Sequence, residues 1–124
     1  MSPSHTEAAT RLAAVRARIA AAAQRYGRDP TSIGLIAVSK TQPAARVAQL
    51  AELGQRDFGE NYLQEALTKI AALSDRALVW HFIGQLQSNK TRAVAEHFDW
   101  VHTVDRAKLA DRLAAQRPAH AAPL

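Results

Sequence analysis

The sequence contains no cysteine, which excludes disulfide bonds, thiolate metal sites and cysteine catalysis within the chain. Aromatic residues make up only 6% of its 124 residues, and no apolar run approaches the ~20 residues that a membrane-spanning helix needs. The five histidines lack the spacing of metal ligands, and no acidic cluster accompanies them, so we predict no metal site. The glycine-rich fingerprints of dinucleotide and P-loop sites are also missing, which argues against those two classes of nucleotide-binding protein.

What the sequence does contain is typical of one globular domain. Hydrophobic residues make up 48% and charged residues 22% of the chain, and alanine is frequent, so we expect helices to dominate and strands to be short. The segment Met1–His5 lacks the charged-then-apolar pattern of a secretory signal, and we therefore expect a cytoplasmic protein.

The chain is basic, with a formal net charge of +5 and a sequence pI near 10.2. Such a balance can indicate nucleic-acid or anionic ligands. The basic residues are scattered, however, and are not interleaved with aromatic residues. We interpret them, Lys69 included, as mostly solvated faces of helices, and we expect neither nucleic acid nor a membrane as a partner. A nucleic-acid-binding module remains an alternative that rests on the pI alone.

Hydrophobic periodicity predicts one amphipathic helix followed by four strand–helix units. Apolar residues recur at helical spacing through residues 6–26, and short apolar runs then alternate with further helical segments. The predicted strands cover residues 33–39, 56–58, 78–83 and 100–104, and the helices that follow them cover residues 43–53, 63–73, 91–97 and 106–116. Gly59 and Gly84 are expected to break the second and third strands. Alternation of this kind implies a parallel sheet with right-handed crossovers.

Polar side chains gather where the predicted strands end. They are Lys40, Glu60, Asn61, His81, Gln85, His102, Thr103 and Asp105. A (β/α)8 barrel builds its active face by converging such groups from several successive strands, whereas an open doubly wound sheet concentrates ligand contacts at one switch point. The pattern therefore favours an α/β fold of the (β/α)8 TIM-barrel family. A complete barrel needs about 250 residues, so we expect residues 1–124 to form one partial domain, about half a barrel, truncated before the fifth strand.

Lys40 is the first candidate for chemistry because it ends an apolar strand. The run Leu35–Val38 is typical of a buried parallel strand, and the lysine follows directly after Ser39. Partial burial at such a place disfavours an ammonium ion and leaves a nucleophilic amine that can form a Schiff base with an aldehyde. The alternative is a lysine that closes the strand and extends its charged end into solvent.

Four segments, taken in order, resemble the pyridoxal phosphate homeostasis protein family, whose members are relatives of the barrel domain of alanine racemase. They are Ala37–Thr41, Phe58–Glu65, Trp80–Lys90 and His102–Arg106. The resemblance runs from about residue 6 to residue 124 and covers the N-terminal half of the family's barrel. It implies a single-domain (β/α)8 barrel in which pyridoxal 5′-phosphate (PLP) is held as a Schiff base on the lysine of the first strand, here Lys40.

The resemblance also implies a function. Family members are similar to cofactor carriers or regulators of vitamin B6 balance without established catalytic turnover, and PLP-dependent enzymes that receive the cofactor are the expected partners. The family's phosphate-binding loops follow its late strands, which this chain lacks, so we expect weak binding unless a partner supplies the missing half. Three alternatives stay open: a racemase-like Schiff-base enzyme, an inactive truncated remnant, and two copies that pair through their open sheet edges.

The remaining candidate residues each have two interpretations. Asn61 is placed to face the cofactor ring, or to cap the following helix. Glu60 is better interpreted as a carboxylate that pairs with a nearby basic group. Strand alternation places His81 and Ile83 on one face of the third strand, with the flanking aromatic residues on the other. His81 is either a hydrogen-bonded core residue or a direct cofactor contact, and the same choice holds for His102.

Overall fold

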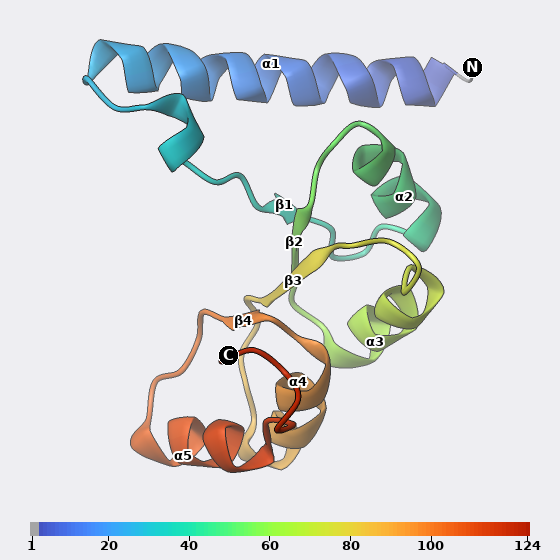
Figure 1. Ribbon diagram of the computed structural model, residues 1–124. Coiled ribbons are helices and arrows are strands. Elements are labelled where there is room, and N and C mark those ends of the chain that lie inside the picture. Colours follow the sequence, from blue (N-terminus) through green and yellow to red (C-terminus); the bar gives the residue numbers. More distant parts are fainter. Residues whose placement is uncertain (1–2) are drawn as a thin grey trace.

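The computed structural model describes residues 3–124, and Figure 1 shows how their elements are arranged. The helices are α1 (Pro3–Arg25), α2 (Ala44–Glu52), α3 (Leu63–Ala72), α4 (Thr91–His97) and α5 (Ala107–Gln116), with short 3-10 helices η1 (Pro30–Ser32) and η2 (Ser88–Lys90). The strands are β1 (Ala37–Val38), β2 (Asp57–Glu60), β3 (Val79–Phe82) and β4 (Trp100–Val101). This order confirms the predicted first helix and the four strand–helix units. None of the helices that the structure describes is long and apolar enough to cross a membrane.

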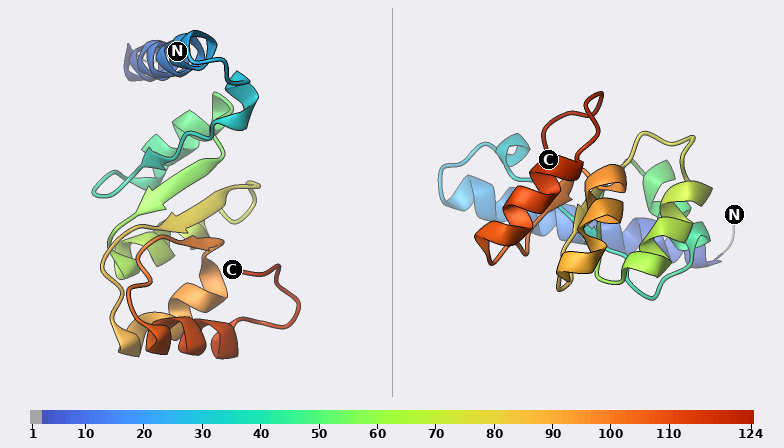
Figure 2. Two further views of the ribbon diagram at one scale, coloured as in Figure 1. Left: turned by 90° about the vertical axis from the view of Figure 1, so that its left-hand side faces the viewer. Right: turned by 90° about the horizontal axis from the view of Figure 1, so that it is seen from below.

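The four strands form one parallel sheet in the order β1–β2–β3–β4, as the alternation of elements predicts. Val38 pairs with Gly59, Gly59 with His81, and His81 with Trp100, so one row of residues crosses the whole sheet. Helices α2, α3 and α4 lie on one side of this sheet, and α5 packs against α4 (Figure 1). The left view in Figure 2 looks onto the opposite side, where no described helix covers the strands.

The hydrophobic core lies between the sheet and its helices. Phe58, Trp80 and Phe82 of β2 and β3 are each at most 5% exposed, and the ring of Phe82 meets that of Phe98 edge-on at 5.3 Å. The rest of the core consists of Val47, Ala66, Leu73, Leu86, Val94, Ala95, Leu109 and Leu113. Full burial of each large apolar side chain contributes about 1.5–3 kcal/mol. Trp80 and Phe82 share this face, as the alternation along β3 predicts.

Two strands are shorter than predicted. β1 covers only Ala37–Val38 and not residues 33–39, and β4 ends at Val101 rather than at residue 104. Both are edge strands of the sheet, with a hydrogen-bonding partner on one side only. Their ladders are short, and no strand within residues 3–124 pairs with their outer sides.

Gly59 does not break β2, contrary to the prediction, because the strand continues through it to Glu60. A Cβ atom at residue 59 would lie 3.0 Å from Ile83 Cδ1 and 3.1 Å from Ile36 Cγ2. The glycine therefore marks a close approach of side chains on the face opposite the helices, rather than the end of the strand. The predicted break at Gly84 is confirmed, since β3 ends two residues earlier at Phe82.

Candidate functional site

The carboxyl ends of the four strands meet along one edge of the sheet. Backbone hydrogen bonds continue the ladder past the strands there, with Ser39 N donating to Gly59 O at 2.9 Å and His102 N donating to Phe82 O at 3.0 Å. This edge therefore brings together the segments that contain most of the predicted site residues. They are Lys40 after β1, Glu60 and Asn61 at the end of β2, and His102 after β4.

Lys40 lies in the turn after β1, and its side chain is exposed. The expected partial burial is therefore wrong. Lys40 is not buried because β1 lies at the edge of the sheet, where no described strand flanks β1 on its outer side. Within residues 3–124, no hydrogen bond or ion pair engages the Lys40 ammonium group. The amine is accessible, and nothing in the described chain competes for it.

Behind this turn, on the helix side of the sheet, lies a buried charged network. Lys69 of α3 is 4% exposed, and its Nζ donates to Glu60 Oε2 at 3.0 Å, to Glu65 Oε1 at 2.7 Å and to the Ser39 carbonyl at 2.6 Å. Ser39 Oγ donates to Glu60, which is fully buried, and Thr41 N donates to Glu65. The hydrogen bond from Lys69 holds the pKa of the Glu65 carboxyl below its usual value. Glu60 is thus a pairing carboxylate, as predicted.

The assignment of Lys69 to a solvated face was wrong. It lies on the buried side of α3, three residues after the fully buried Ala66 and four after Glu65. The spacing from Glu65 predicts an ion pair along the helix. Sequence alone does not show that Glu60, at the end of a neighbouring strand, completes the pair and makes the burial of both charges tolerable.

Asn61 does not cap α3, so that alternative is wrong. The cap position is Tyr62, and no side chain bonds the first turn. The Oδ1 atom of Asn61 is buried and has no hydrogen-bond partner in the described chain. A Cβ atom at residue 84 would lie 2.1 Å from the Asn61 carbonyl oxygen, so Gly84 is required for the close approach of these two segments. Buried polar atoms are nearly always paired, and two other buried amide oxygens, of Gln49 and Gln116, also lack a partner in the described chain. Among the three residues, Asn61 is the one that directly follows a strand at the carboxyl edge of the sheet.

His81 lies at the centre of a polar chain on the face opposite the helices. Its Nε2 lies 2.7 Å from Asp57 Oδ2, its Nδ1 lies 2.9 Å from His102 Nε2, and it is 5% exposed. If Nε2–H of His81 donates to the carboxylate, Nδ1 accepts from His102 and leaves Nδ1 of His102 free to accept a proton. The Trp100 ring stacks on His81 with centroids 5.7 Å apart. His81 is thus a hydrogen-bonded, buried residue, and direct contact with a cofactor stays a prediction.

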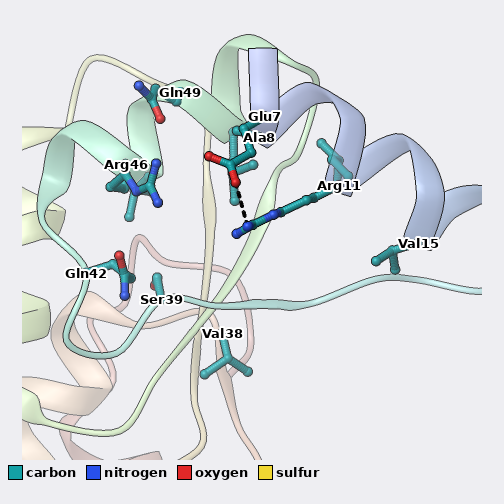
Figure 3. Close-up of a pocket in the computed structure, with 12 residues that line it drawn as sticks. Glu7, Ala8, Arg11, Val15, Val38, Ser39, Gln42, Arg46 and Gln49 are labelled. Carbon is teal, nitrogen blue, oxygen red and sulfur yellow. Dashed lines mark hydrogen bonds and ion pairs between the residues drawn. The ribbon is translucent and has the colours of Figure 1, made fainter. Parts of the chain in front are cut away.

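Cavities border both edge strands of the sheet. One of about 390 Å³ lies between α1, β1 and α2, and Figure 3 shows Arg11, Gln42 and Arg46 around it. Another of about 570 Å³ lies beside β4 and α5 and is lined by Trp100 and Leu113 among others. Within the described residues, no three histidine, aspartate or glutamate side chains gather in a way that could hold a metal ion. A third cavity, of about 330 Å³, lies between α1, η1 and the start of β2.

The family model of the alanine racemase N-terminal domain matches residues 10–124. The chain belongs to this family. It is 63% identical to the pyridoxal phosphate homeostasis protein of Pseudomonas aeruginosa over 116 residues, which cover 94% of this chain and 50% of that protein. The pyridoxal phosphate homeostasis protein of Escherichia coli K12 is 57% identical over 116 residues, covering 91% of this chain and 50% of the relative. The chain spans about half the length of the curated relatives it matches.

Solved structures agree with this assignment. PipY of Synechococcus elongatus PCC7942, solved with PLP bound, superposes with a TM-score of 0.75 at 47% identity, covering 88% of this chain and 47% of PipY. The same protein without PLP superposes with a TM-score of 0.74 at 48% identity, covering 87% of this chain and 46% of PipY. The resemblance inferred from the four sequence segments is therefore confirmed.

Proposed function

We propose that this chain binds PLP as a Schiff base on Lys40 and acts in vitamin B6 homeostasis as a carrier or regulator. The observation that carries the proposal is that Lys40 and Asn61 follow the neighbouring parallel strands β1 and β2 at the same edge of the sheet. Lys40 offers an accessible amine without a partner, and the Asn61 amide oxygen is buried without one. High identity to proteins named for pyridoxal phosphate homeostasis supports the same ligand.

The residues present fit an aldehyde cofactor. PLP supplies an aldehyde, and the condensation forms a carbon–nitrogen double bond to Lys40 Nζ and releases water. The reaction needs the uncharged form of the amine, and the lone pair of Lys40 Nζ has no competing partner in the described chain once its proton is lost. Asn61 would offer the cofactor its buried amide oxygen as a hydrogen-bond acceptor. His102, two residues beyond β4, adds a polar side chain to the same edge.

We propose no catalytic turnover for the chain. Its expected partners are PLP itself and the cytoplasmic PLP-dependent enzymes that receive the cofactor. A racemase-like enzyme is the second candidate, favoured by the Asp57–His81–His102 chain, whose terminal nitrogen is placed to accept a proton. Incubating the PLP-loaded chain with single enantiomers of amino acids separates the two, because an enzyme converts them over many turnovers whereas a carrier leaves them unchanged.

The four strand–helix units are, in this proposal, about half of a (β/α)8 barrel. The parallel order of the strands and the chain's coverage of half of its relatives support it. Two copies pairing β4 of one with β1 of the other would keep all strands parallel and close the sheet, with Trp100 and Val38 buried inside. Sedimentation at micromolar concentration tests this pairing. A dimer that Trp100→Asp dissociates supports it, and a monomeric mass for the parent chain contradicts it.

PLP titration of the purified chain tests the ligand assignment. We expect saturable formation of the visible Schiff-base band, with borohydride trapping at Lys40 when the labelled peptide is mapped. Lys40→Ala should abolish the saturable phase, whereas the matched variant Lys108→Ala, on exposed α5 surface, should retain it. Weak labelling spread over Lys90 and Lys108 without saturation would contradict the proposal.

A further inference from the structure

The turn that carries Lys40 is anchored on both sides to one helix. The preceding residue, Ser39, accepts a hydrogen bond from Lys69 through its carbonyl group and donates one to Glu60 through its hydroxyl group. The following residue donates its backbone N–H to Glu65. Both neighbours of Lys40 are thus bound to the charged network based on α3, while the Lys40 side chain remains outside it.

This network is more than packing requires. Burying charges is unfavourable, and apolar residues of similar size often give equal or greater stability than a buried ion pair. Thr41, which donates its N–H to Glu65, has an unusual backbone conformation, with φ of +65°. The network therefore also stabilises this conformation. A β-branched residue rarely adopts that region, and such residues persist only where the surroundings over-determine them. What the network achieves in the molecule is therefore the fixed shape of the turn.

We propose that Lys69, Glu60 and Glu65 are positioning residues that hold the turn 39–41 so that Lys40, and not Lys69, is the lysine that reacts with an aldehyde. This inference rests on the proposed function and adds a selection between two nearby amines. Lys69 Nζ has carboxylate and carbonyl oxygens at 2.6–3.2 Å, and hydrogen bonds to these oxygens occupy its protons. Lys40 has none of these partners and is exposed.

The test uses the full chain with PLP and follows the rate and the site of Schiff-base formation. Glu65→Ala removes the acceptor of the Thr41 N–H at a side chain that is 32% exposed, so the fold has little to lose. We expect both the rate of labelling at Lys40 and the apparent affinity for PLP to fall about tenfold. This factor corresponds to the loss of one charge-assisted hydrogen bond. Glu65→Gln keeps an acceptor oxygen and should recover most of the rate. Glu52→Ala is the matched control, since it removes an exposed glutamate that pairs with Arg76.

Two further readouts separate positioning from general stability. Ser39→Ala removes the hydroxyl donor to the buried Glu60 carboxylate without changing any charge. It should lower the unfolding midpoint modestly and, under conditions where the variant is fully folded, slow labelling about threefold. The ratio of borohydride-trapped Lys69 to Lys40 should rise in Glu65→Ala and return to the parent's value in Glu65→Gln. A purely structural role would change the midpoint and leave this ratio unaltered in the folded protein.

The outcomes are distinguishable from failure of the proposed function. If the parent labels at Lys40, and Glu65→Ala and Ser39→Ala label at the parent's rate and ratio, the positioning role is overturned and the PLP assignment stands. If the parent gives no saturable label at Lys40, the PLP assignment falls and the inference falls with it. A tenfold loss in Glu65→Ala that Glu65→Gln recovers and Glu52→Ala does not share supports the inference.

Discussion

The two faces of the sheet differ although the same short strands form both. On the helix side Phe58, Trp80 and Phe82 are at most 5% exposed. On the opposite side the neighbouring positions Val38 and Trp100 are 54% and 55% exposed. One face therefore stabilises the fold, while the other offers apolar surface and the hydrogen-bonded polar chain Asp57–His81–His102. Along β3, the buried aromatic residues and the polar His81 therefore alternate from one position to the next.

The polar clusters repeat the same contrast. The Lys69–Glu60–Glu65 network is held between the sheet and α3, where each charge has a partner. The Asp57–His81–His102 chain lies on the opposite face and ends at an exposed histidine. A buried pair resists change because breaking it strands a charge. An exposed end is free to exchange protons with solvent or a ligand.

The largest expected effect is on the helix side of the sheet. Phe58→Ala should lower the free energy of unfolding by about 3–5 kcal/mol, because it removes a fully buried ring and leaves a cavity. Trp100→Ala, on the opposite face of the sheet, should lower the free energy of unfolding of the monomer by less than about 1 kcal/mol. Urea denaturation of both variants measures the difference. Equal losses would mean that the two faces contribute alike and would contradict the comparison.

Breaking the buried network should come next. Lys69→Met leaves Glu60 as an unpaired buried carboxylate and should cost about 3 kcal/mol, whereas Lys108→Met on exposed α5 surface should stay within about 0.5 kcal/mol of the parent. The double variant Lys69→Met/Glu60→Leu should recover much of the loss, because no charge is then stranded. Denaturant midpoints of the three variants check this. If the double variant is no more stable than the single one, the loss does not come from the stranded charge.

A glycine pair tests the close approach at the sheet edge. Gly84→Ala places a Cβ within 2.1 Å of the Asn61 carbonyl oxygen and should destabilise by about 1–3 kcal/mol as the segments separate. Gly34→Ala meets nothing within 4 Å and should be neutral or stabilising by up to about 1 kcal/mol. Thermal unfolding distinguishes them. Similar midpoints for the two variants would show that the edge tolerates a wider gap.

The smallest effect is a pH dependence of the network. The Lys69 hydrogen bond lowers the pKa of Glu65, and the Thr41 N–H adds to the shift, while partial burial opposes it. Because the folded pKa lies below the unfolded one, the stability from this carboxylate is complete above the unfolded pKa and is lost as pH falls through the lowered value. The parent's advantage over Glu65→Gln should therefore shrink on acidification.

Asp29 provides the control for this titration. Its pKa is also lowered, but by hydrogen bonds from Thr31 in the turn before β1. In a Lys69→Met background, the acid-dependent difference at Glu65 should fall, whereas that of Asp29→Asn should persist. Denaturation curves across acidic pH measure both differences. If the two respond alike, Lys69 is not the cause of the Glu65 shift.

Local patterns predict much of this protein because they depend on neighbours in the chain. Alternation along β3 predicts that Trp80 and Phe82 share one face while His81 lies on the other, and helical periodicity places the helices to within a few residues. Which of the two faces packs against the helices is shown by the structure. The position of Lys40 at the end of a strand follows from the apolar run before it. Glu60 is predicted to pair, although its partner is not.

Contacts between distant residues explain what the sequence does not reveal. Lysine is a residue type that usually lies at the surface, and only the packing of α3 on β2 makes Lys69 a buried partner of Glu60. Gly59 has the pattern of a strand break, yet its role is to leave room for Ile36 and Ile83. The exposure of Lys40 depends on what flanks β1, which no local pattern contains.

The sequence by itself thus determined the order of elements, which residues of β3 share a face and the position of Lys40 directly after the first strand segment, since all three depend on residues within a few positions of one another. The tertiary structure decided which charges are buried, which glycines are required and which face of the sheet stays open. Those properties depend on how closely segments nine to thirty residues apart approach one another, and only the packed arrangement of α3, β2 and the turn at Lys40 shows it.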